Sequence, residues 1–227
     1  MRLYDIHTHI LPNMDDGAKD KEQSKIMLMM LKEQGITDVV LTPHYYPFES
    51  PLKAFLKKRK ECFDEIKDMF DELGLKAHIG AEVYFSEVLF AQESLTELCI
   101  DGKNYLLLEL PFGEKNKQKI VDALYQLSAN YSVKIILAHL NRYPRFFKND
   151  FLNEVNQMGC LVQVDATVLN NSFKRKKILR YIDNGLIHLV GSDCHNLTTR
   201  KPVFDSLKKN LTEKTYQTLL CAFDNVK

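Results

Sequence analysis

The chain has 227 residues, of which 45% are hydrophobic, and it carries 31 lysines and arginines against 30 aspartates and glutamates. This length suits a single α/β barrel with a large buried core. The balanced charge excludes a nucleic-acid binder that depends on bulk positive charge.

Short apolar segments alternate with longer amphipathic segments along the chain. The apolar segments predict strands at 2–6, 38–42, 76–80, 105–110, 134–138, 160–165 and 187–191. The amphipathic segments predict helices near 20–34, 51–73, 86–95, 115–130, 147–157, 172–183, 202–209 and 212–223. Gly35 and Gly185 stand just before strands, where helix-ending glycines are expected.

The regular alternation of strands and helices predicts the fold class. Strands that are apolar throughout favour a parallel sheet covered by helices. With seven strands, we expect a distorted (βα)7 TIM-like barrel, and a doubly wound open sheet is the alternative. No internal repeat, low-complexity tract or linker interrupts the sequence, which predicts a single domain over 1–227.

Side chains that bind metals follow six of the seven predicted strands. These side chains are His7, His9, Asp16, His44, Glu82, Glu109, His139, Asp193 and His195. The loops that follow barrel strands meet at the carboxyl-terminal face, where active sites form. Imidazole and carboxylate ligands suit Mn²⁺, Fe or Zn²⁺ better than an oxygen-only Ca²⁺ site. This number of ligands exceeds the needs of one ion and would serve three ions that share bridging groups.

Some of these residues also have a purely structural interpretation. His44 or His139, taken alone, could be a hydrogen-bonded core residue. Asp16 could cap the following helix, as could Asp15 or Asp20. Glu109 is harder to explain in this way, because a carboxylate after three leucines in a buried strand needs a cation.

Several motifs resemble those of a known family. They are DIHTHILPNMDDG, TPHY, GAEVYF, AHLNRY and GSDCHN. They are similar to motifs of the PHP (polymerase and histidinol phosphatase) family, and in particular of its bacterial protein-tyrosine phosphatase branch, the CpsB/YwqE type. The resemblance spans nearly the whole chain. It implies the PHP fold, a distorted seven-stranded barrel, with three divalent metal ions, of which Mn²⁺ is the first choice and Fe or Zn²⁺ the alternatives.

The resemblance also implies a role for each residue. One ion would bind His7, His9, Glu82 and Asp193, the second Glu82, Glu109 and His139, and the third Asp16, His44 and His195. A hydroxide held between metals would attack phosphorus, because bound metals lower the pKa of water. The implied catalytic residues are Asp193 together with Arg142 and Arg200, whose guanidinium groups would hold phosphate.

One position departs from the family pattern. The family often has glutamate before the first of these arginines, whereas this chain has Asn141. If that glutamate normally orients the arginine, the replacement would loosen the grip on substrate. Asn141 is not among the implied metal ligands, so metal binding should persist.

The implied substrate is phosphotyrosine in the tail of a bacterial tyrosine autokinase that controls capsule or exopolysaccharide biosynthesis. Aromatic residues in the loops could stack on its ring or simply pack the loops. They are Tyr45, Tyr46, Phe48, Tyr84, Phe85, Phe112 and Tyr143. The basic run at 53–60 could attract an acidic tail, or form the solvated face of a helix.

Four other functions compete with this interpretation. Cys194 and Arg200 have the spacing of a thiol-dependent tyrosine phosphatase, but the loop between them lacks glycine, and Asp193 would raise the pKa of the thiol. Histidinol-phosphate phosphatase, or another small-molecule PHP phosphoesterase, shares the same metal chemistry. A regulatory PHP module that binds metal without turnover is the non-enzymatic alternative. An amidohydrolase would need a bridging lysine and eight strands.

The remaining features concern location. The five cysteines are scattered, which predicts reduced thiols in a cytoplasmic protein. The first residues, MRLYDIH, do not resemble a signal peptide, and no apolar run approaches the ~20 residues that span a bilayer. We therefore expect no membrane insertion and no nucleic-acid partner, while homo-oligomerisation is left open.

Overall fold

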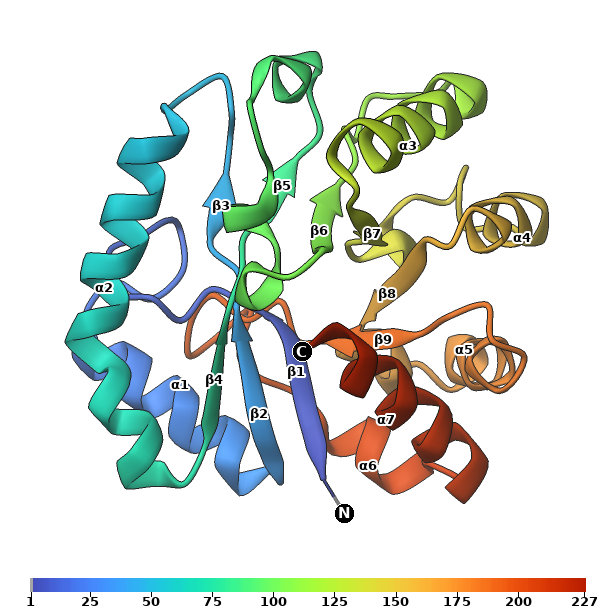
Figure 1. Ribbon diagram of the computed structural model, residues 1–227. Helices are drawn as coiled ribbons and strands as arrows, with labels where there is room; N and C mark the ends of the chain where they lie inside the picture. Colours follow the sequence, from blue (N-terminus) through green and yellow to red (C-terminus); the bar gives the residue numbers. More distant parts are fainter. Residues whose placement is uncertain (1) are drawn as a thin grey trace.

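The computed structural model describes residues 2–227 and arranges its parallel strands in a curled sheet with helices outside it (Figure 1). One set of paired strands consists of β1 (Leu3–Thr8), β2 (Ile36–Leu41) and β4 (Lys76–Ile79). The other set runs in the order β3 (His44–Tyr45), β5 (Glu82–Tyr84), β6 (Tyr105–Glu109), β7 (Lys134–Leu137), β8 (Leu161–Asp165) and β9 (Leu189–Gly191). Each recorded strand pairing is parallel, as expected.

Two of the seven predicted strands, 38–42 and 76–80, are each followed by a short strand that was not predicted. β2 continues into β3 beyond Pro43, which has no N–H to donate to the ladder. β4 continues into β5 beyond Gly80, and Glu82 N donates to the carbonyl of Pro43 at 3.1 Å, so the two short strands stay paired. Both breaks lie just before a predicted metal ligand, His44 or Glu82.

The sheet closes between its first and last strands. Asp193 N donates to the carbonyl of His7 at 2.8 Å, and His9 N donates to the carbonyl of Cys194 at 3.0 Å. A parallel bridge also joins Thr8 to Cys194. This closure confirms the distorted seven-stranded barrel and excludes the open doubly wound sheet.

The α-helices follow the predicted ranges closely. They are α1 (Lys21–Glu33), α2 (Leu52–Leu73), α3 (Lys117–Tyr131), α4 (Asn149–Gln157), α5 (Ser172–Asp183), α6 (Asp205–Asn210) and α7 (Glu213–Val226). Polar side chains cap α1, α3, α5 and α7 in the manner that helix N-termini favour. Within residues 2–227, no helix is both long and apolar enough to cross a membrane.

The helix predicted at 86–95 is wrong in type and length. The chain forms short 3-10 helices here, η1 (Glu87–Ala91), η2 (Thr96–Leu98) and η3 (Ile100–Gly102). These turns bury Leu89, Leu95 and Leu98 one at a time instead of presenting a continuous apolar stripe. Two further 3-10 helices, η4 (Leu140–Arg142) and η5 (Ala166–Asn170), follow β7 and β8.

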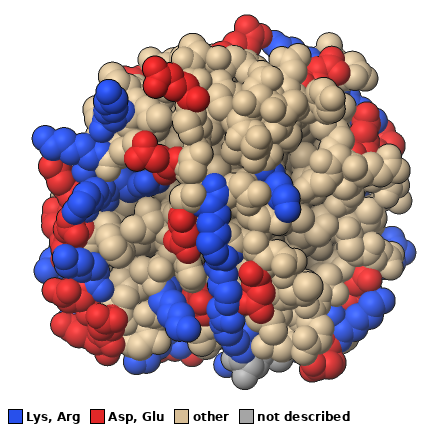
Figure 2. Space-filling view, in the orientation of Figure 1, with Lys and Arg blue, Asp and Glu red and all other residues tan. Residues whose placement is uncertain are grey.

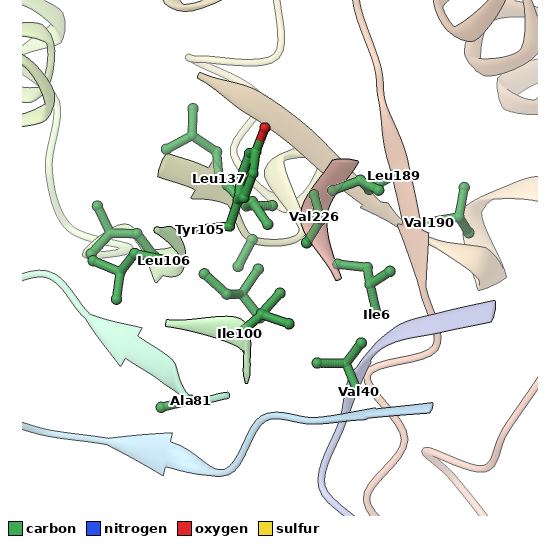
Figure 3. Packing of buried hydrophobic residues seen from close by; sticks show 14 of the residues in the cluster. Ile6, Val40, Ala81, Ile100, Tyr105, Leu106, Leu137, Leu189, Val190 and Val226 are labelled. Atoms are coloured by element: carbon green, nitrogen blue, oxygen red, sulfur yellow. The ribbon is translucent and has the colours of Figure 1, made fainter. Parts of the chain in front are cut away.

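The core fills the barrel from its amino-terminal end. Figure 3 shows Ile100 from η3 and Val226 from α7 beside strand residues such as Ile6 and Leu189. Near this end Tyr4 stacks on Phe223 of α7 with ring centroids 3.8 Å apart. The apolar packing leaves the carboxyl-terminal end of the strands for polar residues.

Candidate metal centre

The predicted metal ligands meet at the carboxyl-terminal end of the barrel. Each is placed by the end of a strand or by the loop after it, and most are fully buried. They are His7, His9, Asp16, His44, Glu82, Glu109, His139, Asp193 and His195. Such a concentration of buried imidazoles and carboxylates is costly unless a cation balances it.

One group of four residues matches the set expected for the first ion. His7, His9, Glu82 and Asp193 each offer a ligand atom within 4.8 Å of the other three. Glu82 Oε2 lies 3.0 Å from His7 Nε2 and 3.2 Å from His9 Nε2. Because all four residues are buried, the protein would shield a cation bound here from solvent.

A second group contains the residues expected for the third ion, with one addition. Asp16, His44 and His195 share a space of metal-site size with His9. Asp16 Oδ1 lies 3.2 Å from His195 Nε2 and 3.5 Å from His44 Nε2. The Asp16 side chain is 65% exposed, so this part of the centre faces solvent.

The third group differs from the expected set in one member. His44, Glu82 and Glu109 come together, whereas the resemblance predicts His139 with the two glutamates. His139 Nε2 nevertheless lies 2.7 Å from Glu82 Oε1 and 3.5 Å from Glu109 Oε1. Glu82 thus contacts residues from every group, as a bridging ligand would.

The donor atoms of this centre fit a divalent cation. Within residues 2–227, five atoms of the candidate ligands are buried without a hydrogen-bond partner. They are His44 Nδ1, Glu82 Oε2, His139 Nδ1, Asp193 Oδ1 and His195 Nε2. Buried polar atoms are rarely left unpaired, so five of them in one cluster indicate a place where a cation binds. Imidazole nitrogens and carboxylate oxygens are the donors that Mn²⁺, Fe and Zn²⁺ accept.

The charges of the buried acids lead to the same conclusion. Burial, and then the negative charge of Glu82, raises the pKa of Glu109 to about 7. Burial would also raise the pKa of Glu82, but His7 and its neighbouring imidazoles lower it well below its usual range. The two glutamates therefore compete for the positive charge of the same imidazoles. A metal ion would supply further positive charge.

Asp15 supports the centre, although the sequence suggested only a helix cap for it. Its Oδ2 lies 2.7 Å from His9 Nδ1 and accepts the backbone N–H of His44 at 2.9 Å. The cap of α1 is Asp20, which accepts from Gln23 N. Carboxylates behind metal-binding histidines orient the ring and fix its tautomer. The only sequence signal for this role is the adjacent acid pair after the two histidines.

Gln163 is a second supporting residue that sequence analysis missed. It lies inside the apolar strand β8 and is fully buried. Its Oε1 accepts the backbone N–H of His139 at 2.5 Å and lies 3.4 Å from His7 Nδ1. A glutamine within an apolar run gives no indication of which residues it will contact.

The two predicted phosphate-binding arginines converge at the edge of the centre. Arg200 Nη2 donates to Asp193 Oδ2 at 2.6 Å, and Arg142 Nη2 donates to the same oxygen. Both side chains are partly exposed, at 37% and 32%. The guanidinium groups can therefore reach an anion that approaches from solvent.

The thiol alternative is not supported by the geometry. Cys194 is fully buried, and burial, followed by the charge of Asp5, raises the pKa of its thiol well above the usual range. Two backbone amides of this segment are also occupied. Cys194 N donates to Ser192 Oγ, and Arg200 N donates to Asn196 Oδ1, so these amides cannot cradle a phosphate.

The expected aromatic residues divide into three groups. Tyr45 and Phe85 are buried and unavailable to a substrate. Tyr46, Phe48 and Tyr84 form a cluster with ring centroids 5.6–5.9 Å apart, and Tyr46 also stacks on His44 at 5.3 Å.

Phe112 lies over Tyr143 at 4.9 Å, and Tyr143 in turn lies 6.0 Å from His139. A cavity of about 520 Å³ adjoins the centre at Asp16 and His44. Aromatic rings and open space are therefore both present beside the candidate ligands.

The basic run at 53–60 contributes to the solvated face of α2. Lys57 pairs with Glu61 and Lys60 with Asp64, while Arg59 donates to the carbonyl of Gly80. Figure 2 shows acidic and basic side chains mixed along the side of the molecule that α2 forms. This mixture favours the solvated-face interpretation for Lys57 and Lys60, whereas Lys58 lines the cavity that adjoins the centre.

Comparisons with known proteins agree with the fold and the motifs. The family model described as capsular polysaccharide synthesis, CpsB/CapC, matches residues 3–224. CapC of Staphylococcus aureus is 30% identical over 223 residues, which cover 94% of this chain and 85% of CapC. The tyrosine-protein phosphatase CpsB of Streptococcus pneumoniae is 27% identical over 212 residues, which cover 88% of this chain and 86% of CpsB.

A solved structure shares the same architecture. It comes from work on YwqE of Bacillus subtilis and CpsB of Streptococcus pneumoniae, described as unique metal-dependent tyrosine phosphatases. The TM-score is 0.78 at 24% identity, with 97% of this chain and 93% of that chain covered. This likeness independently supports the barrel fold.

Proposed function

Because the chain belongs to the CpsB/CapC family of capsular polysaccharide synthesis, we propose that it is a metal-dependent protein-tyrosine phosphatase. The expected resemblance to the CpsB/YwqE branch is confirmed by the family match and by these relatives. The observation that carries the proposal is the cluster of buried imidazoles and carboxylates at the carboxyl-terminal end of the barrel. The whole of 1–227 would act as one catalytic domain.

The cluster would hold three divalent ions, with Mn²⁺ as the first choice. The ligands that we propose are His7, His9, Asp16, His44, Glu82, Glu109, His139, Asp193 and His195. When bound, such ions lower the pKa of water toward neutrality and balance charge on phosphoryl oxygens. His9 and Glu82 stand between neighbouring groups, so they would keep the ions close together.

The remaining residues act on the phosphoryl group. Arg142 and Arg200 would bind its oxygens, because a planar guanidinium meets two oxygens at once. Asp193 holds both arginines through Oδ2, while its Oδ1 lies 3.3 Å from His9 Nε2 among the ligands. Asp193 thus joins the phosphate-binding arginines to the metal centre.

The substrate would be phosphotyrosine in the tail of a bacterial tyrosine kinase that regulates capsule or exopolysaccharide biosynthesis. Support comes from the tyrosine-protein phosphatase CpsB and from the exposed aromatic rings Phe48 and Phe112. An aromatic rim favours an aryl phosphate over an alkyl phosphate. The five cysteines are free within residues 2–227, which supports action in the reducing cytoplasm.

Metal analysis combined with turnover tests the proposal. Purified protein should contain Mn²⁺ or a similar ion and hydrolyse a phosphotyrosine peptide faster than a phosphoserine peptide or histidinol phosphate. EDTA should abolish turnover, and His7→Ala should lose both metal and activity. Cys194→Ala is the matched control and should retain both. Turnover that survives EDTA but disappears in Cys194→Ala would refute the metal-dependent mechanism.

A further inference from the structure

Asp165 ends β8, at the place that Glu109 occupies on β6. It is nevertheless outside the three groups of metal-site size found within residues 2–227. Asp165 is only 4% exposed, and a carboxylate at this depth needs a cation or several donors. Its partner must therefore be a protein side chain.

That partner is Arg142, which Asp165 binds through both carboxylate oxygens. Arg142 Nε donates to Oδ2 at 2.8 Å, and Nη2 donates to Oδ1 at 3.0 Å. A bidentate pair of this kind fixes the plane and the direction of the guanidinium. Nη2 also donates to Asp193, so Arg142 spans from Asp165 to the metal centre.

Asn141 holds Asp165 in turn. The backbone N–H of Asp165 donates to Asn141 Oδ1 at 2.9 Å, and Asn141 Nδ2 donates to Asp165 Oδ2 at 3.1 Å. Asn141 and Arg142 both belong to η4, the turn after β7. These contacts therefore tie that turn to the end of β8 and support the arginine indirectly.

Arg142 needs this anchor because a second cation lies beside it. Arg142 and Arg200 donate to the same oxygen of Asp193, so their like charges are close together. Asp165 supplies a second negative charge on the side of Arg142 that faces β8. The two guanidinium groups can then remain together while both are partly exposed.

We propose that Asp165 is a positioning residue for phosphate binding, which holds Arg142 at the edge of the metal centre in the orientation that lets Arg142 and Arg200 receive one phosphoryl group together. This inference rests on the proposed phosphatase function. It assigns to β8 a task that differs from metal binding. It also means that a carboxylate orients Arg142 in this chain, although Asn141 stands where the family often has glutamate.

Asp165→Asn tests the proposal because it keeps the shape of the side chain and removes its charge. With Mn²⁺-loaded protein, we expect the Kd for inorganic phosphate and the KM for p-nitrophenyl phosphate to rise about tenfold, as the loss of a charge-assisted hydrogen bond predicts. The kcat should change much less, because the arginine binds ground state and transition state alike. Manganese content should stay at the wild-type value.

A double-mutant cycle shows whether Asp165 acts through Arg142. In an Arg142→Ala background, Asp165→Asn should change the Kd for phosphate by less than about twofold. Asp150→Asn is the matched control, because Asp150 pairs with the partly exposed Lys117 at 3.3 Å on the surface. If Asp165→Asn fails to fold, Asn141→Ala removes both hydrogen bonds to Asp165 and should weaken phosphate binding in the same direction.

Three results would overturn the proposal. They are an unchanged Kd for phosphate in the folded Asp165→Asn or Asn141→Ala protein, an undiminished effect in the Arg142→Ala background, and loss of manganese in Asp165→Asn. The proposed function fails separately, if the wild type binds phosphate but does not hydrolyse phosphotyrosine.

Discussion

At the scale of single residues, Asp15 and Asp16 show how neighbours in sequence take different tasks. Asp16 is largely exposed and lies among the candidate ligands His44 and His195. Asp15 is buried behind His9, and its other oxygen accepts the backbone N–H of Gly17 at 3.0 Å. One aspartate thus offers its charge to a metal, while the other orients a ligand.

Asp15→Asn should weaken metal binding without removing any ligand. Burial would raise the pKa of Asp15, but the His9 imidazole outweighs burial and lowers it below the usual range, so the carboxylate is charged at neutral pH. Loss of such a partner typically costs about 10- to 100-fold in metal affinity. Calorimetric titration of metal-free protein with Mn²⁺ measures the change in metal affinity. Asp20→Asn is the control, because Asp20 only caps α1.

Residue type and position along a strand were enough to predict which side chains gather at the centre. Each candidate ligand lies at the end of a strand or in the loop that follows it. In a parallel barrel these strand ends and loops meet at one face. The supporting residues could not be predicted in this way. Asp165 also ends a strand, yet it faces Arg142, and this distinction depends on the conformation of η4.

At the scale of elements, the approach of β9 to β1 places the first histidine. A methyl group added to Gly191 would lie 2.6 Å from Cβ of His7 and 3.0 Å from Nε2 of Gln163. Real side chains do not approach so closely, so only glycine permits this spacing. The close contact sets the position of His7 beside Asp193.

Gly191→Ala should therefore destabilise the fold and disturb the metal centre together. We expect a loss of about 1–3 kcal/mol in the free energy of unfolding, the usual cost of overpacking, and lower manganese content. Urea denaturation and metal analysis give the two readouts. Gly113→Ala is the control, because no heavy atom lies within 4 Å of the added methyl group. Equal stability of the two variants would contradict the argument.

The order and type of most elements could also be predicted from periodicity, but local interruptions could not. The division of β2 from β3 has a visible cause in Pro43. The turns from η1 to η3 have no comparable cause in the local sequence. Ile100, for example, is buried by contacts with residues distant in sequence such as Gly80. Tertiary packing, rather than local propensity, determines the path of that segment.

At the scale of the whole molecule, the two ends of the barrel carry different electrostatic networks. Opposite the metal centre, His78 lies between two carboxylates, with Nδ1 2.7 Å from Asp101 and Nε2 3.2 Å from Asp38. Asp38 also pairs with Arg2 at 2.8 Å. This network joins β2, β4 and η3 to the start of β1.

The His78 network predicts a loss of stability at alkaline pH. Burial lowers the pKa of His78, but Asp101 and Asp38 outweigh burial and raise it from 6.5 to about 9. A raised folded-state pKa gives stability that is complete below about pH 6.5 and is lost as the pH rises through 9. The contribution is at most about 3 kcal/mol.

Urea denaturation from pH 6 to 10 should show this decline in the wild type and a flatter profile in His78→Gln. His188→Gln is the control, because burial lowers the pKa of His188 to about 4 and its effect falls on the acid side. An alkaline decline that persists unchanged in His78→Gln would show that other groups cause it.

Metal binding should stabilise the whole barrel, because its candidate ligands come from strands far apart in the sequence. His7 belongs to β1, Glu82 to β5 and Glu109 to β6, while Asp193 follows β9. Without a cation, the closely placed carboxylates of Glu82 and Glu109 share the charge of nearby imidazoles and of Arg142. An ion that binds the folded state alone therefore both relieves this repulsion and joins strands around the ring.

The size of this stabilisation follows from mass action. At a free Mn²⁺ concentration of about 1,000 times the Kd, folding gains about 4 kcal/mol, which corresponds to a rise in Tm of roughly 8–16 °C for a chain of this size. Thermal unfolding of chelated protein across a Mn²⁺ titration measures the rise. Ca²⁺, which prefers oxygen-only sites, should raise the Tm much less. A Tm that responds equally to both ions, or to neither, would mean that the imidazoles do not bind the metal.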